Sequence, residues 1–145
     1  MAKKDTLALL KQVSLFEGLS RRELEQIMKV AKEIEFDESH AIVEEGATGV
    51  GFHLILEGEA HVLVGGRKRA TLRAGDYFGE MSLIDGSGRT ATVTSGPEGL
   101  SAFRLSPAAF TNLIDQQPHI ALLLLKGLVS RVRKLEAQAG RTAAG

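Results

Sequence analysis

The stretch Phe52–Arg69, FHLILEGEAHVLVGGRKR, carries the pattern that decides the fold. Apolar residues stand at alternate positions, namely Phe52, Leu54, Leu56, Ala60, Val62 and Val64. Alternate side chains of a β-strand share one face, so this pattern predicts strands broken by a turn at Gly58 and a hairpin tip at Gly65-Gly66. His53 and His61 have the opposite parity, and we expect them on a solvated outer face.

Outward from this stretch, glycines separate short apolar runs from about residue 34 to about residue 105. Frequent glycine between short runs of period two is typical of many short strands joined by tight turns. Apolar spacing is helical before and after this region. The sequence therefore predicts an α+β fold: an antiparallel β-roll, or jelly-roll-like barrel, flanked by N-terminal helices and two C-terminal helices.

The flanking helices have recognisable boundaries. Ser20 followed by Glu23 predicts a capping box, and Ser106-Pro107 predicts a helix start. Pro118 separates a short helix from a longer one that runs to about Ala139. The long helix carries apolar residues at spacings of four and three: Ala121, Leu125, Leu128, Val132, Leu135 and Ala139. This seam predicts packing of at least one face on the β-roll, and either a homodimer contact or a contact with a protein partner.

Length and composition limit the function. The chain has 145 residues, which suits a single domain, placed at 1–139 with a disordered tail at 140–145. The formal net charge is zero and there is no cysteine, so a global attraction to nucleic acid, a disulfide framework and thiolate chemistry are excluded. No apolar run has the length of a signal peptide core or a membrane span. We expect a soluble cytoplasmic protein without a membrane role.

The stretch Gly79–Val93, GEMSLIDGSGRTATV, is the candidate ligand site. Strand-like residues flank it, so it is expected to form a loop or a single helical turn between two strands. Free amides at such a turn attract an anion, and the guanidinium of Arg89 can donate to two phosphate oxygens. Hydroxyl groups of Ser82 and Thr90 and the amide of Ala91 can add hydrogen bonds.

Glu80 requires a different partner because a carboxylate repels phosphate. It can accept hydrogen bonds from a neutral group joined to that phosphate, such as a ribose hydroxyl. A cavity within one small β-roll suits a mononucleotide with a cyclised phosphate better than an extended dinucleotide.

These motifs resemble the cyclic nucleotide-binding domain family of the catabolite activator protein, the regulatory subunits of cyclic-AMP-dependent kinase and cyclic-nucleotide-gated channels. The likeness runs from Leu15-Phe16-Glu17-Gly18-Leu19 to the last helix, over about residues 13–136. Phe78–Ile84 and Arg89–Val93 are similar to the family's phosphate-binding cassette. The resemblance implies that Arg89 pairs with the cyclic phosphate, Glu80 binds the 2′-hydroxyl, and Gly79, Ser82 and Thr90 add further donors.

The resemblance leaves the base open. Threonine after the cassette arginine, here Thr90, is similar to cyclic-GMP-binding members, whereas bacterial activators with serine there bind cyclic AMP. Matching the last helices places Leu135 and Glu136 near the base, with Arg131 one turn earlier. The expected ligand is therefore cyclic AMP, with cyclic GMP as the alternative, and no cofactor is expected.

Other functions have weaker support. His53 and His61 invite a metal-dependent jelly-roll enzyme, but the H-x-H motif of such sites is absent, and so are catalytic motifs such as G-x-S-x-G. We expect a non-enzyme and no metal. Two alternatives stay open: an interaction scaffold that does not use the pocket, and a regulatory piece of a longer channel, kinase or transporter. Autonomous DNA binding is not expected, because the sequence ends about where family transcription factors continue into a winged helix-turn-helix.

Overall fold

The computed structural model describes residues 3–48, 50–86, 88 and 90–140. The N-terminal helices are α1 (Lys3–Lys11), the 3-10 helix η1 (Ser14–Phe16) and α2 (Arg21–Val30). The strands are β1 (Lys32–Phe36), β2 (Ala41–Val43), β3 (Phe52–Val64), β4 (Arg67–Arg73), β5 (Tyr77–Phe78) and β6 (Thr92–Leu105), with the short helix α3 (Ser82–Asp85) between the last two. The C-terminal helices are α4 (Pro107–Gln116) and α5 (His119–Gln138).

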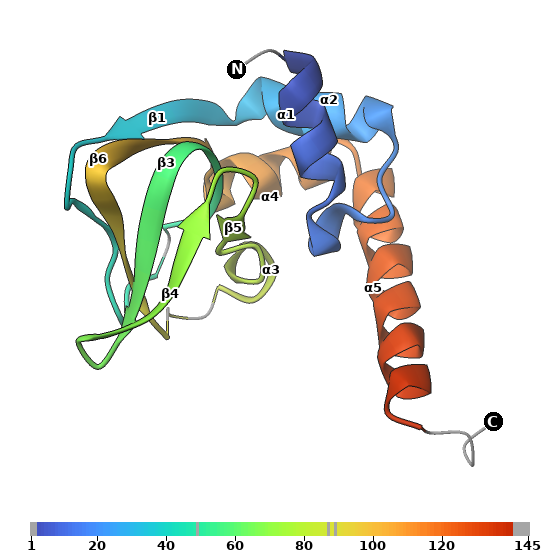
Figure 1. Cartoon of the computed structure of the whole chain (residues 1–145). Coiled ribbons are helices and arrows are strands. Elements are labelled where there is room, and N and C mark those ends of the chain that lie inside the picture. The colour runs from blue at the N-terminus through green and yellow to red at the C-terminus, as the bar shows by residue number, and fades with distance from the viewer. Residues whose placement is uncertain (1–2, 49, 87, 89, 141–145) are drawn as a thin grey trace.

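All strand pairings described are antiparallel, and β3 and β6 form the centre of the sheet. The strand order is β1-β6-β3-β4, with β2 added to β6 and β5 added to β3. The strands curl into a roll, and the helices gather at one end of it (Figure 1). This confirms the predicted α+β fold, a β-roll with helices before and after it along the chain. The predicted hairpin tip at Gly65-Gly66 is also confirmed, since Val64 pairs with Arg67.

The expected turn at Gly58 is wrong, because β3 runs through it without a break. Gly58 has a φ of 84° and lies where the pairing of β3 with β6 shifts register. A side chain there would collide with the backbone carbonyl of Gly99 on β6. Glycine is required for a bulge and a close strand approach, which a sequence pattern does not distinguish from a turn.

The prediction that His53 lies on a solvated face is also wrong. His53 is 1% exposed and stacks on Phe78, with ring centroids 4.9 Å apart and planes 9° apart. The first half of β3 is buried on both faces: Phe52, Leu54 and Leu56 pack toward the helices, whereas Ile55 packs inside the roll. Strict alternation of apolar and polar residues is expected only for a strand that has one buried face and one solvent-exposed face.

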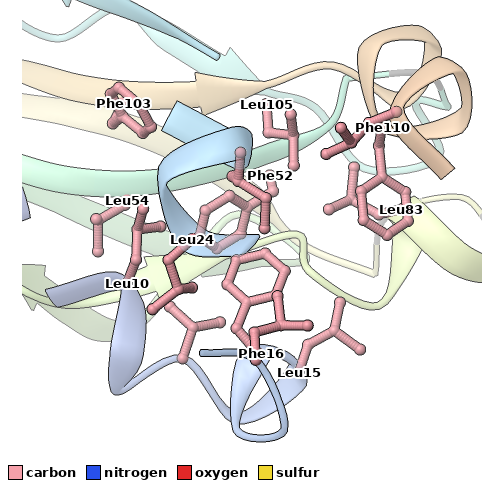
Figure 2. Packing of buried hydrophobic residues seen from close by; sticks show 14 of the residues in the cluster. Leu10, Leu15, Phe16, Leu24, Phe52, Leu54, Leu83, Phe103, Leu105 and Phe110 are labelled. Atoms are coloured by element: carbon pink, nitrogen blue, oxygen red, sulfur yellow. The ribbon is translucent and has the colours of Figure 1, made fainter. Parts of the chain in front are cut away.

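The core consists of two apolar clusters. The larger one joins the helical end to the sheet, and Phe16 of η1 meets Phe52 of β3 edge to face at 5.5 Å (Figure 2). The smaller one fills the roll and includes Ile55, Val93 and Ala102. Burial of this apolar area is the main stabilising contribution, at about 25 cal/mol per Å² removed from water.

The predicted helix boundaries at Ser20, Ser106 and Pro118 are confirmed. The capping box of Ser20 and Glu23 is formed, and the Ser106 hydroxyl oxygen accepts a hydrogen bond from the Ala109 amide at 3.1 Å. Gly140 follows α5 with a φ of 71°, and the rest of the expected tail lies outside the described residues. None of the described helices is long and apolar enough to span a bilayer.

The expected seam of α5 is divided in the structure. The buried side of the helix consists of Ile120, Leu124 and Gly127, which lie between the seam positions. Leu125, Val132 and Leu135 of the seam are exposed, as are Leu122 and Val129. Only the first half of α5 packs into the core, and its second half stands apart from the strands (Figure 1).

Candidate functional site

The connection between β5 and β6 contains a single helical turn, α3, which is one of the two forms, a loop or a helical turn, that the sequence predicts. Gly79 leaves β5 with a φ of 89°, and Gly86 ends α3 with a φ of 65°, donating its amide to the Ser82 carbonyl. Both conformations lie in the left-handed region that favours glycine, which is why glycines bracket the turn. The helical turn is therefore confined to the few residues between these two glycines.

A cavity of about 320 Å³ lies between this turn and the roll. Its walls are Val62, Phe78, Gly79, Glu80, Met81, Ser82, Gly88, Thr90, Ala91 and Val93. This volume lies at the lower end of the usual range for small-molecule sites, about 300–1,000 Å³. The cavity pairs an apolar wall from the strands with a polar wall from the turn.

Most of the predicted ligand-binding residues meet at this cavity. Gly79, Glu80 and Ser82 reach it from one side of α3, and Thr90 and Ala91 from the other. Glu80 and Ser82 are half-buried, and Thr90 is exposed. Arg89, the predicted partner of the phosphate, lies outside the described residues.

The residues predicted to meet the base are elsewhere. Arg131 lines a separate cleft of about 320 Å³ with Lys11, Glu17 and Lys134. Leu135 is 59% exposed, and Glu136 is exposed as well. None of these three α5 residues is among those that line the cavity beside α3.

Contacts with η1 and the residues after it hold α5 in this position. The Lys134 ammonium donates to the Glu17 carboxylate at 2.7 Å, and this hydrogen bond lowers the pKa of Glu17. Farther up the helix, Gly127 lies against Gly18, where a side chain on Gly127 would come within 3.0 Å of the Gly18 nitrogen. The last turns of α5 are thereby directed away from the roll.

A family model of the cyclic nucleotide-binding domain matches residues 33–117, which is more than half of the chain. The chain belongs to this family. The match spans the roll, the α3 turn and α4, so it contains every residue that lines the cavity.

Relatives of this cyclic nucleotide-binding domain include named kinase proteins. A cAMP-dependent protein kinase regulatory subunit from Mycosarcoma maydis is 34% identical over 113 residues, which cover 72% of this chain and 22% of the relative. A cGMP-dependent protein kinase from Plasmodium berghei (strain Anka) is 28% identical over 108 residues, 74% of this chain and 13% of the relative. The chain thus spans less than a quarter of the length of either protein.

A solved structure supports the same fold. The N-terminal domain of a transcriptional regulator from Streptomyces coelicolor A3(2) superposes with a TM-score of 0.78 at 23% identity, covering 89% of this chain and 95% of that chain. At this identity the likeness concerns the fold alone. It agrees with an α+β β-roll that ends in helices.

Sequence reasoning missed the apolar wall of the cavity. Val62 and Val93 line it from paired positions of β3 and β6, and Phe78 lies beside them at the end of β5. The parity of Val62 in its strand indicated an inward side chain, but only the pairing with Val93 shows that both reach the cavity. Phe78 belongs to the stretch Phe78–Ile84 that resembles the cassette, but no ligand contact was predicted for it.

Among the residues that the structure describes, no group of three or more histidine, aspartate or glutamate side chains could hold a metal ion. His61 contacts Glu59 at 3.2 Å, whereas His53 is buried against Phe78. The two histidines raised as metal ligands therefore have different environments.

Proposed function

We propose that this chain is a cyclic nucleotide sensor that binds cyclic AMP or cyclic GMP in the cavity beside α3. The observation that carries the proposal is the convergence of Gly79, Glu80, Ser82, Thr90 and Ala91 on one cavity within a cyclic nucleotide-binding domain. Gly79, Ser82 and Ala91 have small side chains or none, which favours the approach of a ligand to their backbone amides.

The chemistry of the pocket suits a nucleotide with its phosphate cyclised onto its ribose. The Arg89 guanidinium pairs with the phosphate, and the amides and hydroxyls of Ser82 and Thr90 add donors. The Glu80 carboxylate accepts a hydrogen bond from the ribose 2′-hydroxyl. The apolar wall at Val62, Phe78 and Val93 packs against the remaining surface of the nucleoside.

Both bases are compatible with this pocket. The relatives named above include a cAMP-dependent and a cGMP-dependent protein. Their names therefore favour neither adenine nor guanine as the base. Thr90 provides a hydroxyl at the rim that can reach a guanine, and α5 supplies Arg131, Leu135 and Glu136 only if it moves toward the pocket.

A continuous apolar path can carry the effect of binding to the C-terminal helices. The Leu83 amide donates to the Glu80 carbonyl at 3.3 Å, so the two residues belong to one turn. Leu83 is buried beside Phe110 of α4 (Figure 2). Helix α4 in turn packs on α5. In this proposal a ligand that moves Glu80 also moves Leu83 against α4. A micromolar ligand has a binding free energy of about 8 kcal/mol, and only the part of it that differs between the two positions of the helices drives the shift.

The output of the domain is regulatory rather than catalytic in this proposal. The exposed apolar face of α5 offers a surface for a second copy of the chain. Its residues lie three or four positions apart, as in a coiled coil, and they are Leu122, Leu125, Val129, Val132 and Leu135. We therefore infer homodimerisation through α5.

Isothermal titration calorimetry with cyclic AMP and with cyclic GMP tests the proposed function. We expect micromolar or tighter binding of at least one ligand, lost in Arg89→Ala and retained in Arg69→Ala, whose arginine is exposed on the β3–β4 hairpin. A folded, nucleotide-free protein that binds neither ligand would instead support a scaffold that does not use its pocket.

Sedimentation equilibrium tests the dimer separately. The wild type is expected to dimerise, and Val129→Glu, which places a charge in the middle of the exposed α5 face, is expected to be monomeric. Gln138→Glu, beyond that face at the end of α5, serves as the matched control. A monomeric wild type at high micromolar concentration would rule out this use of α5.

A further inference from the structure

The turn between β2 and β3 lies against the far end of the cassette. Its residue Gly46 has a φ of 84°, and its carbonyl oxygen lies 3.2 Å from the place where a Cβ on Gly88 would be. Gly88 and Thr90 both line the nucleotide cavity. The position of this turn therefore limits where the cassette can lie.

Glu45 attaches this turn to two strands at once. Its carboxylate oxygen Oε1 accepts a hydrogen bond from the amide of Gly65, in the tip between β3 and β4, at 2.7 Å. Its own amide donates to the hydroxyl oxygen of Thr92, the first residue of β6, at 3.1 Å. A single residue thus joins three segments that are far apart in sequence.

The two strand ends tied by Glu45 also carry the apolar wall of the cavity. Val62 and Val93 are paired in the sheet, and Leu63 pairs with Thr92. The Glu45 bridge therefore acts on the wall formed by β3 and β6 and on the Gly88 side of the cassette. Charged acceptors form stronger hydrogen bonds than neutral ones, which makes a carboxylate well suited to hold a glycine amide in a turn.

We infer that Glu45 is a positioning residue for the nucleotide pocket: by holding the β2–β3 turn between Gly65 and Thr92, it sets the backbone against which Gly88 and the end of the cassette rest. The inference depends on the proposed binding of a cyclic nucleotide. Glu45 itself does not line the cavity, so its effect is transmitted through the turn.

The test compares Glu45→Ala and Glu45→Gln with the neighbouring control Glu44→Ala. Glu44 is exposed, and its side chain forms no hydrogen bond with the residues that the structure describes. Calorimetry should give a Kd about tenfold higher for Glu45→Ala, a Kd within about threefold of wild type for Glu45→Gln, which keeps an acceptor oxygen, and no change for Glu44→Ala.

Amide hydrogen exchange of the ligand-free proteins supplies a second measurement. The Gly65 amide should exchange about tenfold faster in Glu45→Ala and at nearly the wild-type rate in Glu45→Gln. In NMR spectra of the same proteins, the amide chemical shifts of Gly88 and Thr90 should change only in Glu45→Ala. Wild-type binding with an unchanged Kd in Glu45→Ala overturns this inference alone. A wild type that binds neither nucleotide overturns the proposed function and this inference together.

Discussion

Gly18 and Gly127 bring the N-terminal segment and α5 into backbone contact. A side chain on Gly18 would collide with the carbonyl oxygen of Leu123, and one on Gly127 would come within 3.0 Å of the Gly18 nitrogen. Two chain segments more than a hundred residues apart can pack this closely because neither carries a Cβ at the crossing. This contact fixes the direction in which α5 leaves the core.

Substitution of Gly127 by alanine tests the contact. In a free helix this change is stabilising by about 1 kcal/mol. Here we expect destabilisation by about 1–3 kcal/mol, because the new methyl group overpacks the crossing. Urea denaturation measures the change, with the exposed Gln138→Ala expected to stay within about 0.5 kcal/mol of wild type. A more stable Gly127→Ala protein would show that the backbone contact is not tight.

The role of Glu80 can be tested by pairing a variant with a changed ligand. Glu80→Ala is expected to weaken binding of the cyclic nucleotide about tenfold or more, because the 2′-hydroxyl loses its charged acceptor. A 2′-deoxy analogue should bind wild type more weakly by a similar factor. The 2′-deoxy analogue should bind Glu80→Ala no more weakly than the unmodified cyclic nucleotide does. Calorimetry of wild type and Glu80→Ala, each with both ligands, measures these affinities. If the losses in binding free energy from Glu80→Ala and from the 2′-deoxy ligand were additive, Glu80 would not contact the 2′-hydroxyl.

Leu83 and Ile84 form a matched pair within α3. Leu83 is 6% exposed and packs beside Phe110, whereas the next residue, Ile84, is 52% exposed. Leu83→Ala should lower the free energy of unfolding by about 2–5 kcal/mol because it opens a cavity. Ile84→Ala should change it by less than about 0.5 kcal/mol. Thermal and urea unfolding measure both changes. An equal loss of stability in Leu83→Ala and Ile84→Ala would place α3 outside the cooperative core.

Glu23 makes stability depend on pH. Hydrogen bonds from Ser20 lower the pKa of its carboxyl group in the folded protein, opposed by burial and aided by His119. A lowered folded pKa means that the stabilisation is complete above the unfolded pKa, about 4.3, and is lost as pH falls through the folded pKa. The gap in unfolding free energy between wild type and Glu23→Gln should therefore shrink from pH 6 to pH 3. A gap that is constant over this range would contradict the assignment, and Glu44→Gln is the exposed control.

Local patterns were sufficient for much of the fold. The capping box at Ser20, the helix start at Ser106 and the break at Pro118 depend on residues within one turn of each other, and all three are confirmed. The hairpin tip at Gly65-Gly66 is equally local. The polar side of the site was predictable for a similar reason, because Gly79, Glu80 and Ser82 belong to one short segment.

Patterns of period two failed where burial depends on a distant partner. The sequence places His53 on the face opposite Phe52 and Leu54, but the fold covers that face too, with Phe78 stacked on the ring. At Gly58 the same pattern indicates a turn, whereas the approach of Gly99 on β6 makes it a bulge within β3. Neither partner is near in sequence.

The amino-acid sequence alone determined the order of helices, strands and helices, the hairpin, and the short segment that lines the cavity beside α3, since these depend on local spacing, caps and glycine. The tertiary structure decided which side of α5 is buried, why Arg131, Leu135 and Glu136 lie away from the cavity, and how Glu45 joins three segments. The physical reason is that burial, backbone approach and hydrogen bonds between distant segments depend on the pairing of whole elements, which no single stretch of sequence contains.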